Sequence, residues 1–241
     1  MKIKKHIPNL ITLGNLFCGT IATIYAVQAD FVFAGLFVIL GIVFDFFDGF
    51  AARLFNVSGE LGKQLDSLAD MVTSGVVPGI IMLKLIEVNT INASSSFFGN
   101  SFLEISLVGL VLTLGACYRL ATFNIDTRQS DSFIGLPTPA MSLFVISLPL
   151  IQEYSNIEFA LNLITNNYFL IIITILLTYL MNAQLPLFSL KFKDYSVKNN
   201  LIKYVFLIAS LLMIIFLQYI SIPLIIIVYV ALSVISNFSK K

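Results

Sequence analysis

The stretch DFFDGFAARLFNVSGELGKQLDSLAD, residues 45–70, carries four aspartates within a chain that is otherwise strongly apolar. They are Asp45, Asp48, Asp66 and Asp70. An ionised carboxylate at membrane depth is costly unless it faces a cavity, a partner or a bound cation. Four of them so close together therefore indicate a functional site.

The composition places the chain in a lipid bilayer. The 241 residues are 58% hydrophobic and 11% charged, and the mean hydropathy is +0.95. Soluble domains contain about 25% charged residues, so this chain is not an ordinary soluble globule. The net charge of +1 leaves no basic surface for a nucleic acid, and no partner of that class is expected.

Eight segments are apolar and long enough to be expected as membrane-spanning helices, each of which needs about 20 residues. They cover residues 9–28, 31–54, 66–87, 103–124, 138–152, 166–182, 201–217 and 220–236. We therefore predict an all-α, polytopic membrane helix bundle that forms a single domain over residues 1–241. It consists of a six-helix catalytic core, about residues 7–182, and two additional helices, about residues 201–236.

The basic residues predict the orientation of this bundle. With both termini in the cytoplasm, thirteen of the fourteen lysines and arginines lie at the inner face, as the positive-inside rule requires. The exception, Lys84, lies near the outer end of its span, where its long side chain can reach the interface. We expect a multi-pass protein of the cell (inner) membrane, with the four aspartates at the cytoplasmic face.

Two helical stripes place the four carboxylates opposite one another. The first consists of Asp45, Asp48, Gly49, Ala52 and Arg53, and the second of Gly62, Asp66 and Asp70. Each set has the spacing of one helix face, and the pair Ser58-Gly59 predicts a turn that makes the two helices antiparallel. The small residues either leave room for a ligand or allow the helices to pack closely.

Hard divalent cations are the counter-charge that suits this cluster. Arg53 alone cannot neutralise four carboxylates, whereas two ions of Mg²⁺ or Mn²⁺, which prefer carboxylate oxygen, balance them. Two-metal sites serve displacement at phosphorus, because the ions stabilise the attacking and leaving oxygens. The alternative to a metal site is a structural network of ion pairs and hydrogen bonds among the four aspartates. Cys18 and Cys117 have no further ligand at metal spacing and are expected to be buried, unreactive thiols.

The motif in residues 45–70 resembles the signature of the CDP-alcohol phosphatidyltransferase family. That signature reads Asp-x2-Asp-Gly-x2-Ala-Arg-x8-Gly-x3-Asp-x3-Asp, and the chain meets every fixed position. The resemblance implies a helical membrane enzyme, usually a homodimer, with a metal site that faces the cytoplasm. It implies transfer of a phosphatidyl group from a CDP-linked lipid to an alcohol, with CMP as the leaving group.

The same resemblance implies roles for individual residues. Asp45, Asp48 and Asp66 would hold metal, and Asp70 would both contact metal and act as the general base. The residues expected to bind the CDP-lipid are Gly49, Ala52, Arg53, Ser58, Gly62, Asn9 and Thr12.

Two further stretches narrow the acceptor. IPNLITLGNLFCG (residues 7–19) and YRLATFNI with FIGLPTPA (residues 118–125 and 133–140) resemble the bacterial phosphatidylserine synthases of this family. The expected reactants are then CDP-diacylglycerol and L-serine. The candidates to bind the acceptor are Arg119, Asn124 and Arg128.

Alternatives to serine transfer remain open. The serine-specific members usually carry an arginine where this chain has Thr122, which leaves glycerol 3-phosphate or an inositol phosphate as alternative acceptors. An alternative of another class is a cation-coupled transporter. Such transporters often contain inverted repeats with sites at the membrane midplane, whereas this chain shows no internal repeat and its aspartates cluster at one face.

Overall fold

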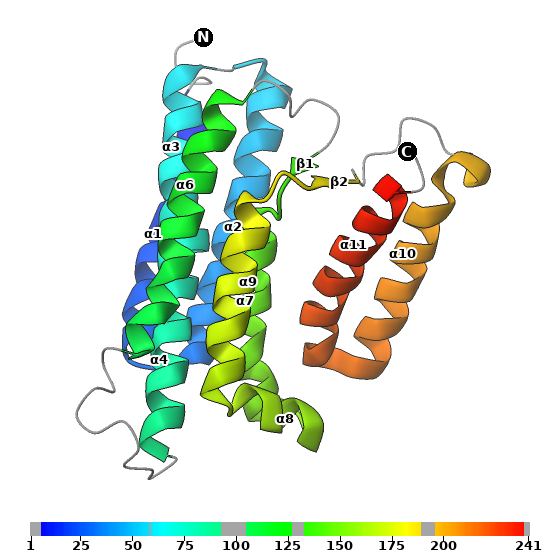
Figure 1. Ribbon diagram of the computed structural model, residues 1–241. Coiled ribbons are helices and arrows are strands. Elements are labelled where there is room, and N and C mark those ends of the chain that lie inside the picture. Colours follow the sequence, from blue (N-terminus) through cyan, green and yellow to red (C-terminus); the bar gives the residue numbers. More distant parts are fainter. Residues whose placement is uncertain (1–5, 58, 93–104, 127–132, 189–195, 239–241) are drawn as a thin grey trace.

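The computed structural model describes residues 6–57, 59–92, 105–126, 133–188 and 196–238. Long helices dominate it, and they alternate in direction along the chain (Figure 1). The all-α, polytopic membrane architecture predicted from the sequence is confirmed. A single two-residue ladder is the exception among the described residues, and it was not predicted: β1 (Phe133–Ile134) pairs antiparallel with β2 (Pro186–Leu187).

The first half of the chain builds the end of the bundle that carries the aspartates. Its elements are α1 (Ile7–Val27), α2 (Phe31–Phe55), α3 (Glu60–Asp70), the π-helical segment η2 (Met71–Val76) and α4 (Val77–Asn92). The last three form one continuous helical span. α2 ends at Phe55, and the left-handed conformation of its C-cap Asn56 (φ 51°) begins the turn to α3, in which the predicted Ser58-Gly59 pair lies.

The second half completes the core and adds a hairpin. Its elements are η3 (Leu107–Leu110), α6 (Val111–Ile125), α7 (Thr138–Tyr154), α8 (Glu158–Ile164), α9 (Asn167–Asn182), α10 (Val197–Leu217), η4 (Gln218–Ile220) and α11 (Ser221–Phe238). α7 continues through Pro149 to Tyr154, beyond the predicted end at residue 152. α8 lies in a segment predicted to be a loop, and it meets α9 at 76°.

Each of the eight predicted segments contains a helix, although fewer pass a test of length and hydropathy. Five described stretches are long and apolar enough to cross a membrane, or six if the bent pair α8 and α9 is one span. That count takes Asn200–Asn237 as one stretch, whereas α10 and α11 form an antiparallel hairpin beside the main bundle (Figure 1). The number eight and the cytoplasmic position of both termini therefore stay predictions.

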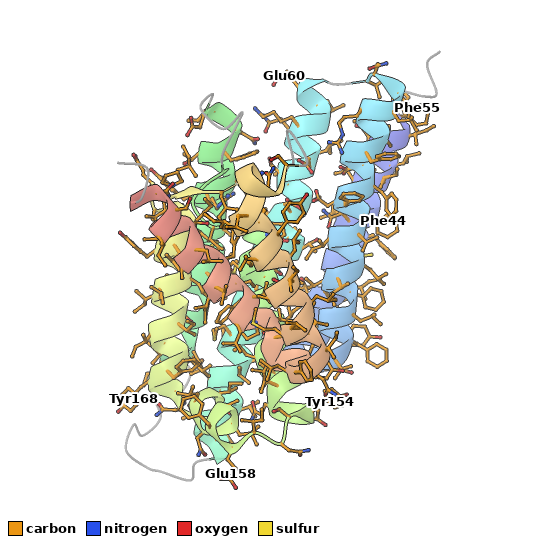
Figure 2. The ribbon with its side chains drawn as sticks, turned by 90° about the vertical axis from the view of Figure 1, so that its right-hand side faces the viewer. Phe44, Phe55, Glu60, Tyr154, Glu158 and Tyr168 are labelled. Atoms are coloured by element: carbon orange, nitrogen blue, oxygen red, sulfur yellow. The ribbon has the colours of Figure 1, made fainter. Side chains whose placement is uncertain are left out.

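The helices present different faces to the core and to the outside. α7 lies deep in the core, where Met141, Val145 and Ile146 are buried. Along α2 Phe33, Phe46, Phe47 and Phe50 are exposed, and Phe44 lies on the outer side of the bundle in Figure 2, whereas Phe37 packs against the core. The turn between α2 and α3 lies at the opposite end of the bundle from Tyr154 and Tyr168 (Figure 2), so the α2–α3 motif occupies one end of the molecule.

Candidate active site

Three aspartates from two helices meet at that end. One carboxylate oxygen from each of Asp45, Asp48 and Asp66 lies within 4.8 Å of the others. Asp48 is buried, and the other two are half-buried. The antiparallel pairing of α2 and α3 therefore brings the two predicted stripes face to face.

Asp70 lies one turn deeper along the α3 span and outside this group of three. Its Oδ1 accepts a hydrogen bond of 3.1 Å from Asn15 Nδ2 on α1. It still lies close enough to Asp45 and Arg119 to interact with both electrostatically. The structure thus brings three of the four predicted metal ligands together and places the fourth beside them, held by a residue that sequence reasoning missed.

The donor set of the three aspartates fits a hard divalent cation. All three ligands are carboxylates, which Mg²⁺ and Mn²⁺ prefer over nitrogen or sulfur donors. Like charges this close in a partly buried setting need a counter-charge. Thr12 orients one carboxylate of this group, because its hydroxyl donates to Asp48 Oδ2 at 2.5 Å. Asp45, Asp48 and Asp66 are therefore the residues that would hold a metal ion.

A cavity of about 460 Å³ opens beside these carboxylates, between the starts of α1 and α3 and the end of α2. The predicted CDP-lipid residues that line it are Asn9, Thr12, Gly49, Ala52 and Gly62. His6 and Lys63 also line it, although the sequence analysis had not assigned them to the site. A cavity of this size accommodates a nucleotide-sized ligand, since ligand pockets run from about 300 to 1,000 Å³.

The two glycines of the motif open this cavity. A Cβ atom added to Gly49 would come no closer than 3.6 Å to a neighbouring atom, and one added to Gly62 no closer than 3.4 Å. These are ordinary contacts, so close helix packing does not require glycine at either position. Of the two explanations for the small residues, room for a ligand is the one that the geometry favours.

Two predicted CDP-lipid residues do not line the cavity. Arg53 is not among its lining residues, and its guanidinium lies over Gly49 at the end of α2. Ser58 lies outside the described residues. α2 ends at Phe55 and α3 begins at Glu60 after its N-cap Gly59, so the turn falls between the two helices at the predicted Ser58-Gly59 pair.

A second, smaller cavity of about 120 Å³ lies between α6 and the end of α9. Arg119, Thr122, Asn182 and Gln184 are among its lining residues. Arg119 is 7% exposed, and its Nε has no hydrogen-bond partner among the residues that the structure describes. A buried guanidinium that keeps an unused donor is suited to bind an anionic group.

The other predicted acceptor residues lie elsewhere. Asn124 does not line the cavity of Arg119, because its Nδ2 donates to Ser67 Oγ at 2.8 Å. Its backbone carbonyl also accepts from the Lys63 ammonium group. Asn124 therefore joins α6 to α3, and Arg128 lies outside the described residues.

The two cysteines differ from each other. Cys18 is buried, as predicted, but Cys117 is exposed. Its prediction was wrong because the buried face of α6 is formed by Gly115, Ala116 and Leu120, and Cys117 points away from that face. An apolar run predicts a helix but does not say which of its residues face the interior.

Comparison with known proteins places this site in a family. The sequence model of the family described as CDP-alcohol phosphatidyltransferase matches residues 5–180. The chain belongs to this family. The match includes both helices of the motif and the cavity beside it.

Relatives within the family differ in the acceptor that their names record. The CDP-diacylglycerol–serine O-phosphatidyltransferase of Bacillus subtilis is 34% identical over 59% of this chain and 75% of its own length. The protein of that name from Helicobacter pylori strain J99 is 37% identical over 61% and 58%. A CDP-diacylglycerol–glycerol-3-phosphate 3-phosphatidyltransferase of Rickettsia bellii is 38% identical over 38% and 51%. The chain thus spans little more than half the length of the Helicobacter and Rickettsia relatives.

Proposed function

We propose that this protein transfers the phosphatidyl group of CDP-diacylglycerol to L-serine and releases CMP. The observation that carries the proposal is the group of three carboxylates of the family motif beside a nucleotide-sized cavity, which motif residues and the start of α1 line together. The names of the Bacillus and Helicobacter relatives support serine as the acceptor.

The proposed reaction is a displacement at phosphorus. The serine hydroxyl oxygen forms a bond to the β-phosphorus of the CDP-lipid, and the bond from that phosphorus to the bridging oxygen breaks, so that CMP leaves. Asp70 takes the proton of the hydroxyl, which is a weak nucleophile without a base. Asp45, Asp48 and Asp66 would hold one or two divalent ions, which would supply positive charge to offset that of the diphosphate.

The cavity residues have proposed roles in holding the CDP portion. Asn9 and Thr12 offer polar groups from α1, while Gly49, Ala52 and Gly62 leave the space for the ligand. Arg53 at the end of α2 contributes positive charge near the diphosphate. Lys63 also lines the cavity and carries a second positive charge, although its ammonium group donates to the backbone oxygen of Asn124.

The acceptor lies on the other side of Asp70 in this proposal. Serine is a zwitterion, and its carboxylate is the group that the unused donor of Arg119 would bind. Arg119 is close enough to Asp70 to interact with it electrostatically. One molecule of serine can therefore present its carboxylate to the arginine and its hydroxyl to the base.

The setting of the enzyme is proposed from the sequence pattern. We place the whole chain in a single membrane domain with the active site at the cytoplasmic face of the cell membrane, where basic residues concentrate. We also propose a homodimer, which the family resemblance implies. Cysteine pairs introduced along one helix at a time, followed by crosslinking in membranes, would test the dimer.

A panel of acceptors tests the function. Purified protein in mixed micelles of detergent and CDP-diacylglycerol is given Mn²⁺ and one of serine, glycerol 3-phosphate, glycerol or inositol. Release of CMP that requires serine supports the proposal. Release with glycerol 3-phosphate but not with serine would overturn the acceptor and favour the second candidate, for which the Rickettsia relative is the supporting observation.

A further inference from the structure

Asn15 links α1 to the aspartate that we propose as the base. It lies in the middle of an apolar helix and is fully buried. Its Nδ2 donates to Asp70 Oδ1 at 3.1 Å, across 55 residues of sequence. Within the part of the chain that the structure describes, Oδ1 is the oxygen of Asp70 that accepts a hydrogen bond, which leaves Oδ2 for the substrate proton or for a metal ion.

The orientation of this amide is fixed from its other end. Thr73 Oγ1 donates to Asn15 Oδ1 at 2.7 Å, and it also lies 3.2 Å from the backbone oxygen of Asn15. An ionised Asp70 only accepts hydrogen bonds, so it must face the amide nitrogen. Thr73 then donates to the amide oxygen, and a flipped amide would turn that oxygen toward the carboxylate and lose the bond to Asp70.

The chain makes room for this contact on two helices. A Cβ atom on Gly41 of α2 would lie 2.6 Å from Thr73 Cγ2 and 2.9 Å from Asn15 Oδ1. A Cβ atom on Gly19, one turn along α1 from Asn15, would collide with Thr73. Both glycines therefore allow α1, α2 and η2 to close around the pair.

The local helix geometry turns Asp70 and Thr73 toward the same neighbour. They are three residues apart, a spacing that puts two side chains on one helix face. Thr73 belongs to the π-helical segment η2, which begins directly after Asp70. Such segments are rare and often occur at functional sites.

We propose that Asn15 is a positioning residue for Asp70 and that Thr73 holds Asn15 in the orientation that this role requires. The proposal rests on the proposed role of Asp70 as the base. The Asn15 amide restrains the carboxylate so that Oδ2 faces the acceptor hydroxyl. A displacement of about 1 Å at a reacting group can lower a rate about 100-fold, so the restraint should affect turnover more than binding.

Four variants test this role. Asn15→Leu keeps the branched shape of the side chain but cannot donate to Asp70. The Thr73 hydroxyl keeps the backbone oxygen of residue 15 as an acceptor. Thr73→Val keeps the shape but loses the hydroxyl, whereas Thr73→Ser keeps the hydroxyl. Thr174→Val is the matched control, since Thr174 is equally buried and its hydroxyl donates within its own helix to Leu170 O.

The measurements are kcat, the KM values for both substrates and the thermal unfolding of each variant in micelles. Asn15→Leu should lower kcat about 10- to 100-fold with the KM for CDP-diacylglycerol within about twofold of wild type. Thr73→Val should lower kcat about 3- to 10-fold by releasing the amide. Thr73→Ser should stay within about twofold of wild type, and the control should match wild type.

Several results would overturn the positioning role. One is a kcat for Asn15→Leu within about threefold of wild type, and another is an equal loss in Thr73→Val and Thr174→Val. If Asn15→Leu does not fold, the comparison of Thr73→Val with Thr73→Ser tests the proposal. Equal kcat values for these two variants would contradict the positioning role. A wild-type protein without serine-dependent CMP release would instead refute the proposed function.

Discussion

Replacement of Arg119 by methionine should cost the enzyme its preference for a carboxylate on the acceptor. The arginine is buried, and its Nε is unpartnered among the described residues, so the proposed bond to serine is charge-assisted and shielded from water. Such a bond contributes about 1.5–3 kcal/mol. At about 1.4 kcal/mol per factor of ten, kcat/KM for serine should fall roughly 10- to 150-fold.

The assay compares two acceptors in the same variant. Serinol has the amine and the hydroxyl of serine but carries a second hydroxymethyl group in place of the carboxylate. Loss of the arginine also changes the electrostatic environment of Asp70, but this affects both acceptors alike. The ratio of kcat/KM for serine over serinol therefore isolates the contact with the carboxylate.

The expected result is a ratio that falls roughly 10- to 150-fold in Arg119→Met while the KM for CDP-diacylglycerol stays near the wild-type value. Arg119→Lys should give an intermediate ratio, because lysine keeps the charge but not the planar fork. If serine and serinol lose activity to the same extent, Arg119 does not bind the acceptor carboxylate. Thermal unfolding of each variant serves as the control for folding.

Three further predictions follow from the site and the packing. Asp70→Asn should lower kcat about 10²- to 10⁴-fold in the CMP-release assay while binding of CDP-diacylglycerol, measured by co-sedimentation with micelles, persists; turnover near wild type would exclude Asp70 as the base. Removal of metal with EDTA should stop CMP release, and Asp66→Ala should raise the Mn²⁺ concentration needed to restore it; activity in EDTA would contradict the metal site. Gly109→Ala should destabilise the fold by about 1–3 kcal/mol and lower the thermal unfolding temperature, because its Cβ would collide with the backbone of Leu83. Gly35→Ala, where the nearest atom lies at 3.9 Å, is the matched control and should not be destabilised.

The helical period was sufficient to predict the arrangement of the aspartates. Asp45 and Asp48 on one helix and Asp66 on the next follow the 3.6-residue repeat, so each pattern defines a face. A turn too short to allow any other pairing then makes the two helices antiparallel neighbours. Their convergence within 4.8 Å is a consequence of local signals, which is why the sequence alone could predict it.

Contacts between helices that are distant in sequence could not be predicted in this way. Asn15 reaches Asp70 across 55 residues, and Asn124 reaches Ser67 across 57. Periodicity shows which side of a helix is polar, but it does not show which neighbour that side meets. The sequence did contain one signal for a role of Asn15. This asparagine lies three residues after Thr12 in an apolar helix, on the same helix face.

Short elements escaped prediction for a different reason. The strands β1 and β2 have two residues each, which is too short for any alternation of apolar and polar side chains to be recognised. α8 has seven residues and ends where α9 begins at a sharp angle. The π-helical turn of η2 lies inside an apolar span, where its composition does not differ from that of an ordinary α-helix.

The opposite faces of α2 explain how a membrane helix keeps the site in register. Phe46, Phe47 and Phe50 are at least half exposed on the outer surface, while Asp48 in the same turns is 7% exposed. Rotation of the helix by half a turn would carry Asp45 and Asp48 toward lipid, which is unfavourable for charged side chains. It would also turn the aromatic rings toward the polar cavity. Contact of the exposed aromatic rings with lipid thus opposes rotation of α2 and keeps Asp45 and Asp48 facing the bundle. The hydrogen bond from Asn15 acts separately, on Asp70.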